Sequence, residues 1–324
     1  MANRHFYWKR QQYEITDRIR VGGREFLLSD RLSSGLRSRH LAYDRVAGPR
    51  GALCVVERQA HSKAAWQRAE VLERLSQQNA ELPQIREFYR SGSEIITVEK
   101  WIEGQDLRWW IQRMRKSGKR QLGTPEAIRL FRQLAHGLSH LHDACGIVHA
   151  DIKPANLIIS NATKKLVLID FGSAWQTERT SRRAEGDGRS DIYGAPEFLR
   201  GDMGVDYRAD YFSLAVTCFE TLTLQLPYDG LGGRAGLPQN AAAGDSMYMP
   251  ASELSAERHQ LADSTWQSID TLLRHSLQLN RDLRPRNRSE FLNGWDSAVA
   301  ACKQATEIQR QTGFWDSILA YFRR

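Results

Sequence analysis

One segment, residues 149–172, constrains the fold of this chain more than any other. It opens with a polar loop, His149-Ala150-Asp151-Ile152-Lys153-Pro154-Ala155-Asn156, and closes with Asp170-Phe171-Gly172. Apolar runs at 157–159 and 166–169 lie between these two motifs and are separated by a polar turn. The pattern predicts a β-hairpin that returns a second carboxylate toward the loop.

The polar groups of this segment suit phosphoryl transfer. The transition state of that reaction spreads negative charge over phosphate oxygens, so catalysis depends on positioning and electrostatic stabilisation. One carboxylate orients the acceptor hydroxyl, and a second carboxylate and an amide oxygen hold magnesium. A lysine offsets charge on the transferred phosphate. The segment contains all of these groups within 24 residues, counted from 149 to 172.

Further motifs match those of one known family. They are Tyr193-Gly194-Ala195-Pro196-Glu197, Asp210-Tyr211-Phe212-Ser213-Leu214 and Arg284-Pro285. With the loop and the Asp-Phe-Gly motif, they make the chain resemble the eukaryotic-type (Hanks-type) serine/threonine protein kinases. The resemblance implies an α+β, bilobal protein-kinase-like fold with a small β-rich N-lobe and a larger helical C-lobe. It also implies that Arg284 pairs with Glu197.

The resemblance gives roles to the residues of the loop and the hairpin. It implies that Asp151 is the catalytic carboxylate and that Lys153 contacts the γ-phosphate and the acceptor. It implies ATP and Mg²⁺ as cofactors, with Asn156 and Asp170 as the metal ligands. A protein acceptor is expected, because small-molecule phosphotransferases of related fold usually lack a lysine at position 153 and lack the segment that ends in Glu197.

Domain boundaries follow from the same comparison. We expect an N-terminal extension at 1–24, a kinase-like domain at 25–302 and an amphipathic tail at 303–324. The N-lobe would cover about 25–102 and the C-lobe about 103–302. The tail carries an apolar face that could dock on the chain itself, bind a partner or lie on a membrane surface. We favour docking on the chain itself.

Local patterns predict individual elements. Apolar residues at helical spacing after Ser62 predict a helix over 62–75 with Ser62 as its N-cap. Thr124 of Thr124-Pro125-Glu126 is the expected N-cap of a longer helix, with proline in the first turn, that ends near Cys145-Gly146. Strands are expected at 51–56 and 95–98, and the Gly- and Ala-rich stretch 229–250 is expected to be a long loop.

The N-lobe departs from the family pattern at two nucleotide-binding elements. The glycine-rich loop retains only Gly35. The strand lysine that binds phosphates is replaced by Glu57, whose charge would repel them. Arg58 could take over through a one-residue shift, or Arg37 or Arg39 could supply the charge. A third possibility is that Glu57 has another role and nucleotide binding is weak, altered or absent.

Two neighbouring elements are affected by this replacement. Glu70, with Glu73 as the alternative, is the expected glutamate of the N-lobe helix, but it cannot form the usual ion pair with another glutamate. The preferred alignment of the hinge places Glu99 at the gatekeeper position and Lys100 next to it, and a one-residue slip would place Val98 there. A buried charge at this point needs a partner, and Lys100 with Glu99 or Glu57 is one such network.

The activation segment departs from the family in a milder way. Ala150 replaces the arginine that clamps a phosphorylated loop, so control by loop phosphorylation is not expected. Hydroxyl groups that could still be modified remain in this segment. They are Thr177, Thr180, Ser181 and Ser190.

Composition narrows the classes of partner and of cellular location. The net charge is +8, from 46 basic and 38 acidic residues, but we identify no clustered basic stripe interleaved with aromatic residues and expect no nucleic-acid partner. Four scattered cysteines indicate reduced thiols, and no apolar run resembles a signal peptide or a membrane span. A cytoplasmic location is therefore expected.

Three functions agree with the sequence. The first is a serine/threonine protein kinase that transfers the γ-phosphate of ATP to a protein hydroxyl. The second is a pseudokinase that acts as a binding or allosteric module, and the third is a kinase-fold enzyme with altered nucleotide chemistry, such as nucleotidyl transfer. The C-lobe motifs favour the first function, and the N-lobe departures favour the other two.

Overall fold

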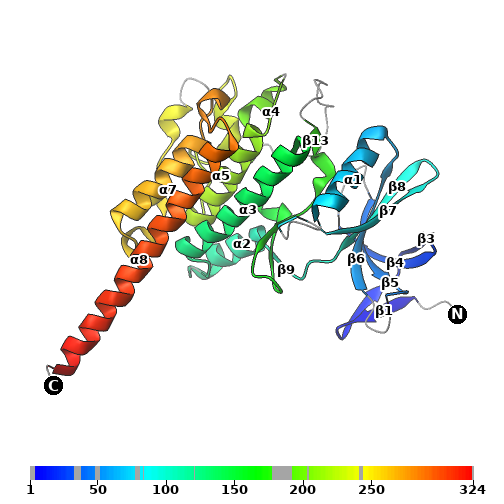
Figure 1. The fold of residues 1–324 in the computed structure, drawn as a ribbon, viewed down its shortest axis with the longest axis horizontal. Coiled ribbons are helices and arrows are strands. Elements are labelled where there is room, and N and C mark those ends of the chain that lie inside the picture. The colour runs from blue at the N-terminus through cyan, green and yellow to red at the C-terminus, as the bar shows by residue number, and fades with distance from the viewer. Residues whose placement is uncertain are drawn as a thin grey trace. The chain divides into compact units, whose positions relative to one another are not determined.

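The computed structural model divides into two compact units (Figure 1). It describes residues 4–32, 38–47, 52–76, 81–82, 84–119, 121–176, 192–202, 204–240 and 244–322. Unit 1 comprises Met1–Gly104 and Ser160–Gly172, and unit 2 comprises Gln105–Ile159 and Ser173–Arg324. Unit 1 is rich in strands and unit 2 in helices, which confirms the bilobal α+β architecture expected from the sequence.

Unit 1 is built on a six-stranded antiparallel sheet. The order of its strands is β3 (Asp17–Val21), β4 (Arg24–Arg31), β5 (Ser38–Asp44), β6 (Ala52–Ala60), β8 (Glu94–Lys100) and β7 (Ile85–Ser91). Alternate side chains of these strands form one apolar cluster, which includes Phe26, Leu28, Ala42, Val56 and Val98. The remaining positions face the opposite side of the sheet, because side chains alternate along a strand. Two predicted strands are thus confirmed, and each is longer than expected.

The N-lobe helix, α1 (Lys63–Ser76), lies close to the predicted range. The side-chain oxygen of Ser62 accepts a hydrogen bond from the backbone N–H of Ala65 at 3.1 Å, as an N-cap does. Trp66 of this helix makes an edge-to-face contact with Phe88 of β7, with ring centroids 4.8 Å apart. An aromatic contact therefore fixes α1 against the edge strand of the sheet.

The first residues of the chain form a β-hairpin that covers part of the sheet. Strands β1 (His5–Trp8) and β2 (Gln11–Glu14) pair antiparallel, and Lys9 at the turn pairs with Glu103 at 2.7 Å. Phe6 packs into a second apolar cluster with Leu27, Leu41 and Leu53 of the sheet. Strand β3 extends the sheet itself, so unit 1 uses residues that the sequence assigned to an extension at 1–24.

This hairpin offers a test of packing in unit 1. Phe6 is 5% exposed, whereas its neighbour Tyr7 is 66% exposed. Phe6→Ala is expected to lower the free energy of unfolding by about 3 kcal/mol, because it removes a buried ring and leaves a cavity. Tyr7→Ala, the matched control, is expected to change it by less than about 0.5 kcal/mol. Urea unfolding measures both, and equal effects would contradict the packing of the hairpin.

Unit 2 is a helical body. Its main helices are α2 (Leu107–Ser117), α3 (Thr124–Cys145), α5 (Arg208–Thr223), α7 (Asp263–Ser276) and α8 (Arg288–Phe322). Shorter elements are β9 (Gly104–Asp106), β10 (Ile147–Val148), η1 (Pro154–Asn156), β11 (Leu157–Ser160), β13 (Trp175–Gln176), α4 (Pro196–Arg200) and α6 (Ala251–Leu254). Stacked aromatic rings join α5 to α8 through Tyr211 and Phe291, and α3 to α8 through Phe131 and Trp295.

The C-terminal end of α3 agrees with the sequence prediction, but the N-cap is Gly123 and not Thr124, which is already the first helical residue. The helix begins at Thr124 with proline in its first turn and ends at Cys145, and Gly146 caps it in the left-handed conformation. The stretch 229–250 is not only loop, because it contains the short helices η3 (Gly232–Gly236) and η4 (Asp245–Met247). In the predicted tail, the backbone of α8 continues as one helix to Phe322 (Figure 1). Side chains from 306 onward lie outside the described residues, so docking of the tail stays a prediction.

Candidate active site

The predicted catalytic loop forms a compact group of side chains in unit 2. The ammonium group of Lys153 lies 2.9 Å from Oδ1 and 2.8 Å from Oδ2 of Asp151. The amide nitrogen of Asn156 donates to the backbone oxygen of Asp151 at 2.8 Å and to its Oδ2 at 2.9 Å. A cation and an amide therefore hold the Asp151 carboxylate in one orientation, while its side chain keeps 13% of its surface exposed.

A buried aspartate on α5 holds this loop in place. The carboxylate of Asp210 accepts hydrogen bonds from the backbone N–H groups of His149 at 2.7 Å and Ala150 at 2.8 Å. Nε2 of His142 on α3 lies 2.9 Å from the same carboxylate. Ala150 has a φ of +65°, a conformation that is rare for a residue with a side chain. Such backbone strain persists where surrounding contacts enforce it, and it is common at functional sites.

The neighbouring amide suits a magnesium ligand. Both hydrogen bonds of the Asn156 side chain use its nitrogen, so its oxygen remains for another partner. Mg²⁺ prefers oxygen ligands and is commonly held by one or two protein groups together with substrate phosphates. Among the described side chains, no group of three or more His, Cys, Asp or Glu residues forms a metal site by itself. The side-chain oxygen of Asn156 fits one ligand position of a metal ion that is held together with a nucleotide.

A buried ion pair fixes the segment that follows the activation loop. The guanidinium of Arg284 meets the carboxylate of Glu197 on α4 through two bonds of 2.6 and 2.9 Å. Both side chains are at most 1% exposed. The guanidinium also donates to the backbone oxygens of Gln278 and Arg208 and lies over the ring of Phe212. The pairing predicted from the sequence motifs is confirmed.

Unit 1 contains a separate group of charged side chains with Arg39 at its centre. One guanidinium nitrogen donates to Oε2 of Glu99 at 2.7 Å. Nε lies 3.5 Å from Oε2 of Glu57, and Nη1 lies 3.7 Å from Oδ2 of Asp170. Arg39 on β5 stands directly opposite Glu57 on β6 in the strand register. The residue in place of the strand lysine is therefore anionic, and a cation from the neighbouring strand faces it.

The electrostatics of this group follow from its burial. The side chains of Arg39 and Glu57 are less than 10% exposed. Burial alone would lower the pKa of Arg39, but the charges of Glu99, Asp170 and Glu57 together raise it above its ordinary value. Among Arg39, Glu57, Glu99 and Asp170, one guanidinium faces three carboxylates, so these four side chains together carry a net negative charge when all are ionised. Three carboxylates at one place favour cations near them over a bare phosphate.

Asp170 of the Asp-Phe-Gly motif lies in unit 1. Its φ is +65°, and its Oδ1 accepts a hydrogen bond from the N–H of Gly172 at 3.2 Å. Its side chain is one-third exposed. A partly exposed carboxylate oriented by its own backbone suits the ligation of a hard cation.

Three other predicted nucleotide residues of unit 1, Arg58, Glu70 and Lys100, are described and have other surroundings. Arg58 pairs with Glu94 at 2.8 Å. Lys100 is exposed at the end of β8, and Glu70 accepts a hydrogen bond from the indole of Trp66. Gly35 lies outside the described residues, as do Arg37 and the hydroxyl residues of the activation segment. The roles of Gly35, Arg58, Glu70 and Lys100 therefore stay predictions.

The structure also identifies the partner of the hinge carboxylate. Glu99 is buried and bonds to Arg39, whereas Val98 belongs to the apolar cluster on the other side of the sheet. Sequence reasoning considered Lys100 as the compensating cation and did not connect Glu99 with Arg39. The alternation of β5 and β8 contains the necessary signal, but only a known strand register brings the two residues together.

Comparison with known proteins decides the family. The sequence model described as "Protein kinase domain" matches residues 52–293. This chain belongs to the protein kinase family. It is 27% identical over 307 residues to "Serine/threonine-protein kinase pkn2" of Myxococcus xanthus, covering 90% of this chain and 34% of that protein. It is 26% identical to "Serine/threonine-protein kinase D" of Synechocystis, covering 67% of this chain and 42% of that protein.

A solved structure supports the fold of this kinase. The Cydia pomonella granulovirus kinase PK-1 superposes with a TM-score of 0.62 at 18% identity, covering 83% of this chain and 93% of that one. The kinase chain described here spans less than half of the length of the two bacterial relatives. Within the described ranges, no helix has the length and apolarity required to cross a bilayer.

Proposed function

We propose that this kinase transfers the γ-phosphate of ATP to a serine or threonine hydroxyl of a protein. The observation that carries the proposal is the contact of Asp151 with both Lys153 and Asn156. In phosphoryl transfer, a fixed carboxylate orients the acceptor hydroxyl, a nearby cation neutralises phosphate charge, and an amide oxygen can hold the metal ion. The names of the bacterial relatives support a protein acceptor. We also propose a cytoplasmic location, because Cys54, Cys218 and Cys302 are buried free thiols.

Each residue of the loop has a separate task in this proposal. Asp151 accepts a hydrogen bond from the acceptor hydroxyl and orients it toward the phosphate. Lys153 holds Asp151 and neutralises charge on the transferred group. Asn156 and Asp170 hold the magnesium ion of Mg-ATP, and that ion, when bound, neutralises phosphate charge.

Arg39 takes the place of the missing strand lysine in this proposal. It is buried and lies on the strand next to Glu57, whereas Arg58 already pairs with Glu94. The guanidinium is multiply paired, so it serves first to keep Glu57 and Glu99 together. Its remaining electrostatic effect offsets part of the repulsion between these carboxylates and a triphosphate.

The second candidate is a pseudokinase. It is favoured by the same group of unit 1, because three acidic side chains around one arginine oppose the binding of a polyanion. In this case the motifs of unit 2 would support a binding surface and not a reaction. The two candidates differ in whether Mg-ATP binds.

A thermal-shift titration with ATP distinguishes the active kinase from the pseudokinase. With Mg²⁺ in excess, ATP at about 100 times its Kd is expected to stabilise the protein by about 2.7 kcal/mol, which corresponds to a rise of several degrees in Tm. Without a divalent cation, the rise is expected to be smaller, because the three carboxylates that face Arg39 then meet bare phosphates. An absent shift with Mg-ATP would favour the pseudokinase.

Isotope transfer then identifies the reaction. Casein incubated with ATP labelled at the γ-phosphate is expected to gain label, and casein incubated with ATP labelled at the α-phosphate is not. Phosphoamino-acid analysis is expected to recover phosphoserine or phosphothreonine. Label from the α-phosphate would instead support nucleotidyl transfer.

A further inference from the structure

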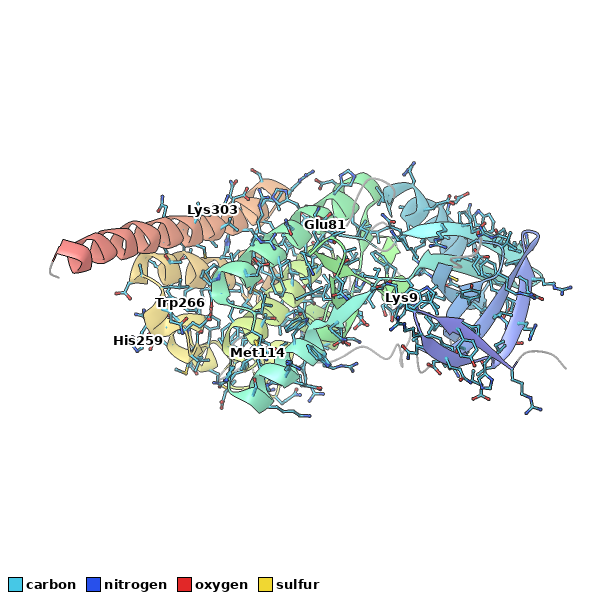
Figure 2. All side chains as sticks on the ribbon, turned by 90° about the horizontal axis from the view of Figure 1, so that it is seen from below. Lys9, Glu81, Met114, His259, Trp266 and Lys303 are labelled. Atoms are coloured by element: carbon cyan, nitrogen blue, oxygen red, sulfur yellow. The ribbon has the colours of Figure 1, made fainter. Side chains whose placement is uncertain are left out.

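Helix α2 presents an outward surface that the proposed function does not use. The helix buries Leu107, Ile111 and Met114, which lie on one face at i, i+4 and i+7. Figure 2 labels Met114 on this helix. The opposite face exposes Trp109, whose side chain keeps 37% of its surface accessible. A large aromatic residue on an exposed helix face is a frequent component of recognition surfaces.

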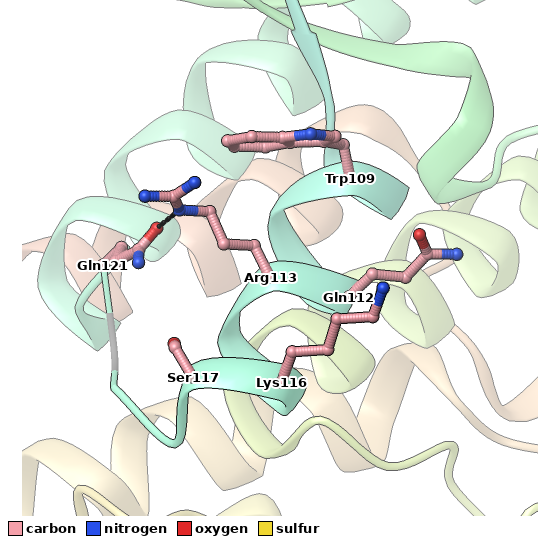
Figure 3. Close-up of a pocket in the computed structure, with 6 residues that line it drawn as sticks. All are labelled: Trp109, Gln112, Arg113, Lys116, Ser117 and Gln121. Carbon is pink, nitrogen blue, oxygen red and sulfur yellow. Dashed lines mark hydrogen bonds between the residues drawn. The ribbon is translucent and has the colours of Figure 1, made fainter.

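A pocket of about 480 Å³ lies on this face. Its lining consists of Trp109, Gln112, Arg113, Lys116, Ser117 and Gln121 (Figure 3). The guanidinium of Arg113 lies 5.1 Å from the ring centroid of Trp109, and its Nε donates to the side-chain oxygen of Gln121 at 2.7 Å. The lining contains two cations and no carboxylate. We call these six residues the α2 pocket.

The sequence around the α2 pocket is strongly basic. Between 107 and 123 there are six basic residues and no acidic one. They are Arg108, Arg113, Arg115, Lys116, Lys119 and Arg120. This local cluster, with its two adjacent tryptophans, corrects the expectation that the chain has no basic segment interleaved with aromatic residues.

Intramolecular contacts use only part of this charge. Arg115 donates to Glu220 and to the backbone oxygen of Leu224, and Arg108 lies 3.5 Å from Asp106. Among the described residues, no acidic group pairs with Lys116 or Arg113. Basic residues in a last helical turn stabilise the helix dipole, which accounts for Arg115 and Lys116. The helix dipole does not account for Arg113 in the middle of the helix or for the exposed side chain of Trp109.

We propose that the α2 pocket binds an acidic segment of a partner protein. Arg113 and Lys116 match carboxylates, and the Trp109 ring offers a face to an apolar or aromatic side chain. The amide of Gln112 provides donors and an acceptor, and the amide of Gln121, whose oxygen accepts from Arg113, provides donors; these groups match the C=O and N–H groups of a peptide. A phosphodiester, or a doubly ionised phosphate monoester, offers only acceptors through its phosphate oxygens, so a peptide uses this lining more fully.

This proposal goes beyond phosphoryl transfer and does not depend on it. The partner is defined by chemistry alone: a segment rich in Asp or Glu that contains at least one aromatic or large apolar residue. It could belong to a substrate or to a regulator of the kinase.

Fluorescence anisotropy tests the proposal with the full chain. The probe is a fluorescein-labelled copolymer of glutamate and tyrosine, measured without ATP at about 0.1 M salt, where distant charges are largely screened. Lys116→Glu is expected to weaken binding about tenfold, because it reverses a charge inside the pocket. Trp109→Ala is expected to weaken binding about fivefold through lost stacking.

The matched control is Lys303→Glu on α8. Lys303 is also an exposed lysine on a helix of unit 2 (Figure 2), and its replacement changes the net charge by the same amount. This variant is expected to change the affinity less than about twofold. Circular dichroism verifies that all variants remain folded.

Three results would overturn the proposal. The first is an equal loss in Lys116→Glu and Lys303→Glu, which would indicate attraction by net charge alone. The second is no binding of the copolymer by the parent chain. The third is stronger binding of duplex DNA or phosphatidylserine vesicles than of the copolymer, with the same dependence on Lys116. Because the assay contains no ATP, failure of the proposed kinase reaction would leave its result unchanged.

Discussion

Asparagine in place of Asp151 is expected to lower the rate of phosphoryl transfer by about 10²–10⁴-fold, the range typical for loss of a positioned acid or base. The neutral amide retains the size of the side chain, but it no longer accepts a proton or a strong hydrogen bond from the acceptor hydroxyl. Lys153 also loses its ion-pair partner, whose oxygens lie 2.8 and 2.9 Å away. The initial rate of label transfer from γ-labelled ATP to casein measures the effect.

The matched control for this substitution is Asp296→Asn. Asp296 lies on α8 and pairs with Arg132 at 2.7 Å, so it is also an aspartate in an ion pair with a basic side chain. Its replacement is expected to leave the transfer rate within about twofold, because an ion pair this exposed contributes little. The melting temperature and the shift with Mg-ATP are to be compared for both variants. Transfer by Asp151→Asn at the rate of the parent chain would remove Asp151 from the reaction.

The parts of the site that the sequence predicts are those held by local contacts. Asp151, Lys153 and Asn156 lie within six consecutive residues, counted from 151 to 156, and their contacts form within that loop. The helix ends at Ser62 and Gly146 follow from capping chemistry, which is also local. For these features, the residue pattern alone restricts the backbone to few conformations.

Long-range contacts were predicted only where a family motif supplied them. Arg284 and Glu197 are 87 positions apart, and only the resemblance to kinases connected them in advance. Arg39 and Glu99 are 60 positions apart, and no motif pointed to their bond. Their meeting depends on the register of β5, β6 and β8, and a slip of one residue would place each side chain on the other face.

The predicted boundary at residue 25 also failed to reveal a long-range contact. The apolar residues before 25 lack a family motif, and the sequence assigned them to an extension. In the structure, Phe6 reaches the sheet because the β1–β2 hairpin folds onto Leu27, Leu41 and Leu53. Burial of such a ring depends on a surface made by three other strands, which a local pattern does not reveal.

Removal of the buried cation at Arg39 is expected to have the largest effect on stability in unit 1. Arg39→Ala leaves Glu57, Glu99 and Asp170 without the guanidinium that they share. Loss of one partner from a buried ion pair costs about 3–5 kcal/mol, because the remaining charge stays uncompensated in a poorly solvated place. Urea unfolding measures this loss, and the Mg-ATP thermal shift is expected to disappear.

Arg58→Ala is the matched control for this loss. Arg58 lies on the adjacent strand, and its side chain is one-third exposed in its pair with Glu94. A pair of this exposure contributes less than about 1 kcal/mol. Equal destabilisation by Arg39→Ala and Arg58→Ala would contradict the central position of Arg39. It would also return Arg58 to consideration as the replacement for the strand lysine.

A charge exchange separates the structural task of Arg39 from its task toward the nucleotide. Residues 39 and 57 are direct partners in the β5–β6 register, so the double variant Arg39→Glu with Glu57→Arg keeps one cation and one anion at the same pair. Most of the stability lost in Arg39→Ala is expected to return. If Mg-ATP binding returns as well, the nucleotide requires a cation at this place on the sheet and not arginine on one particular strand. If stability returns but binding does not, the position of Arg39 on β5 is specific to the nucleotide.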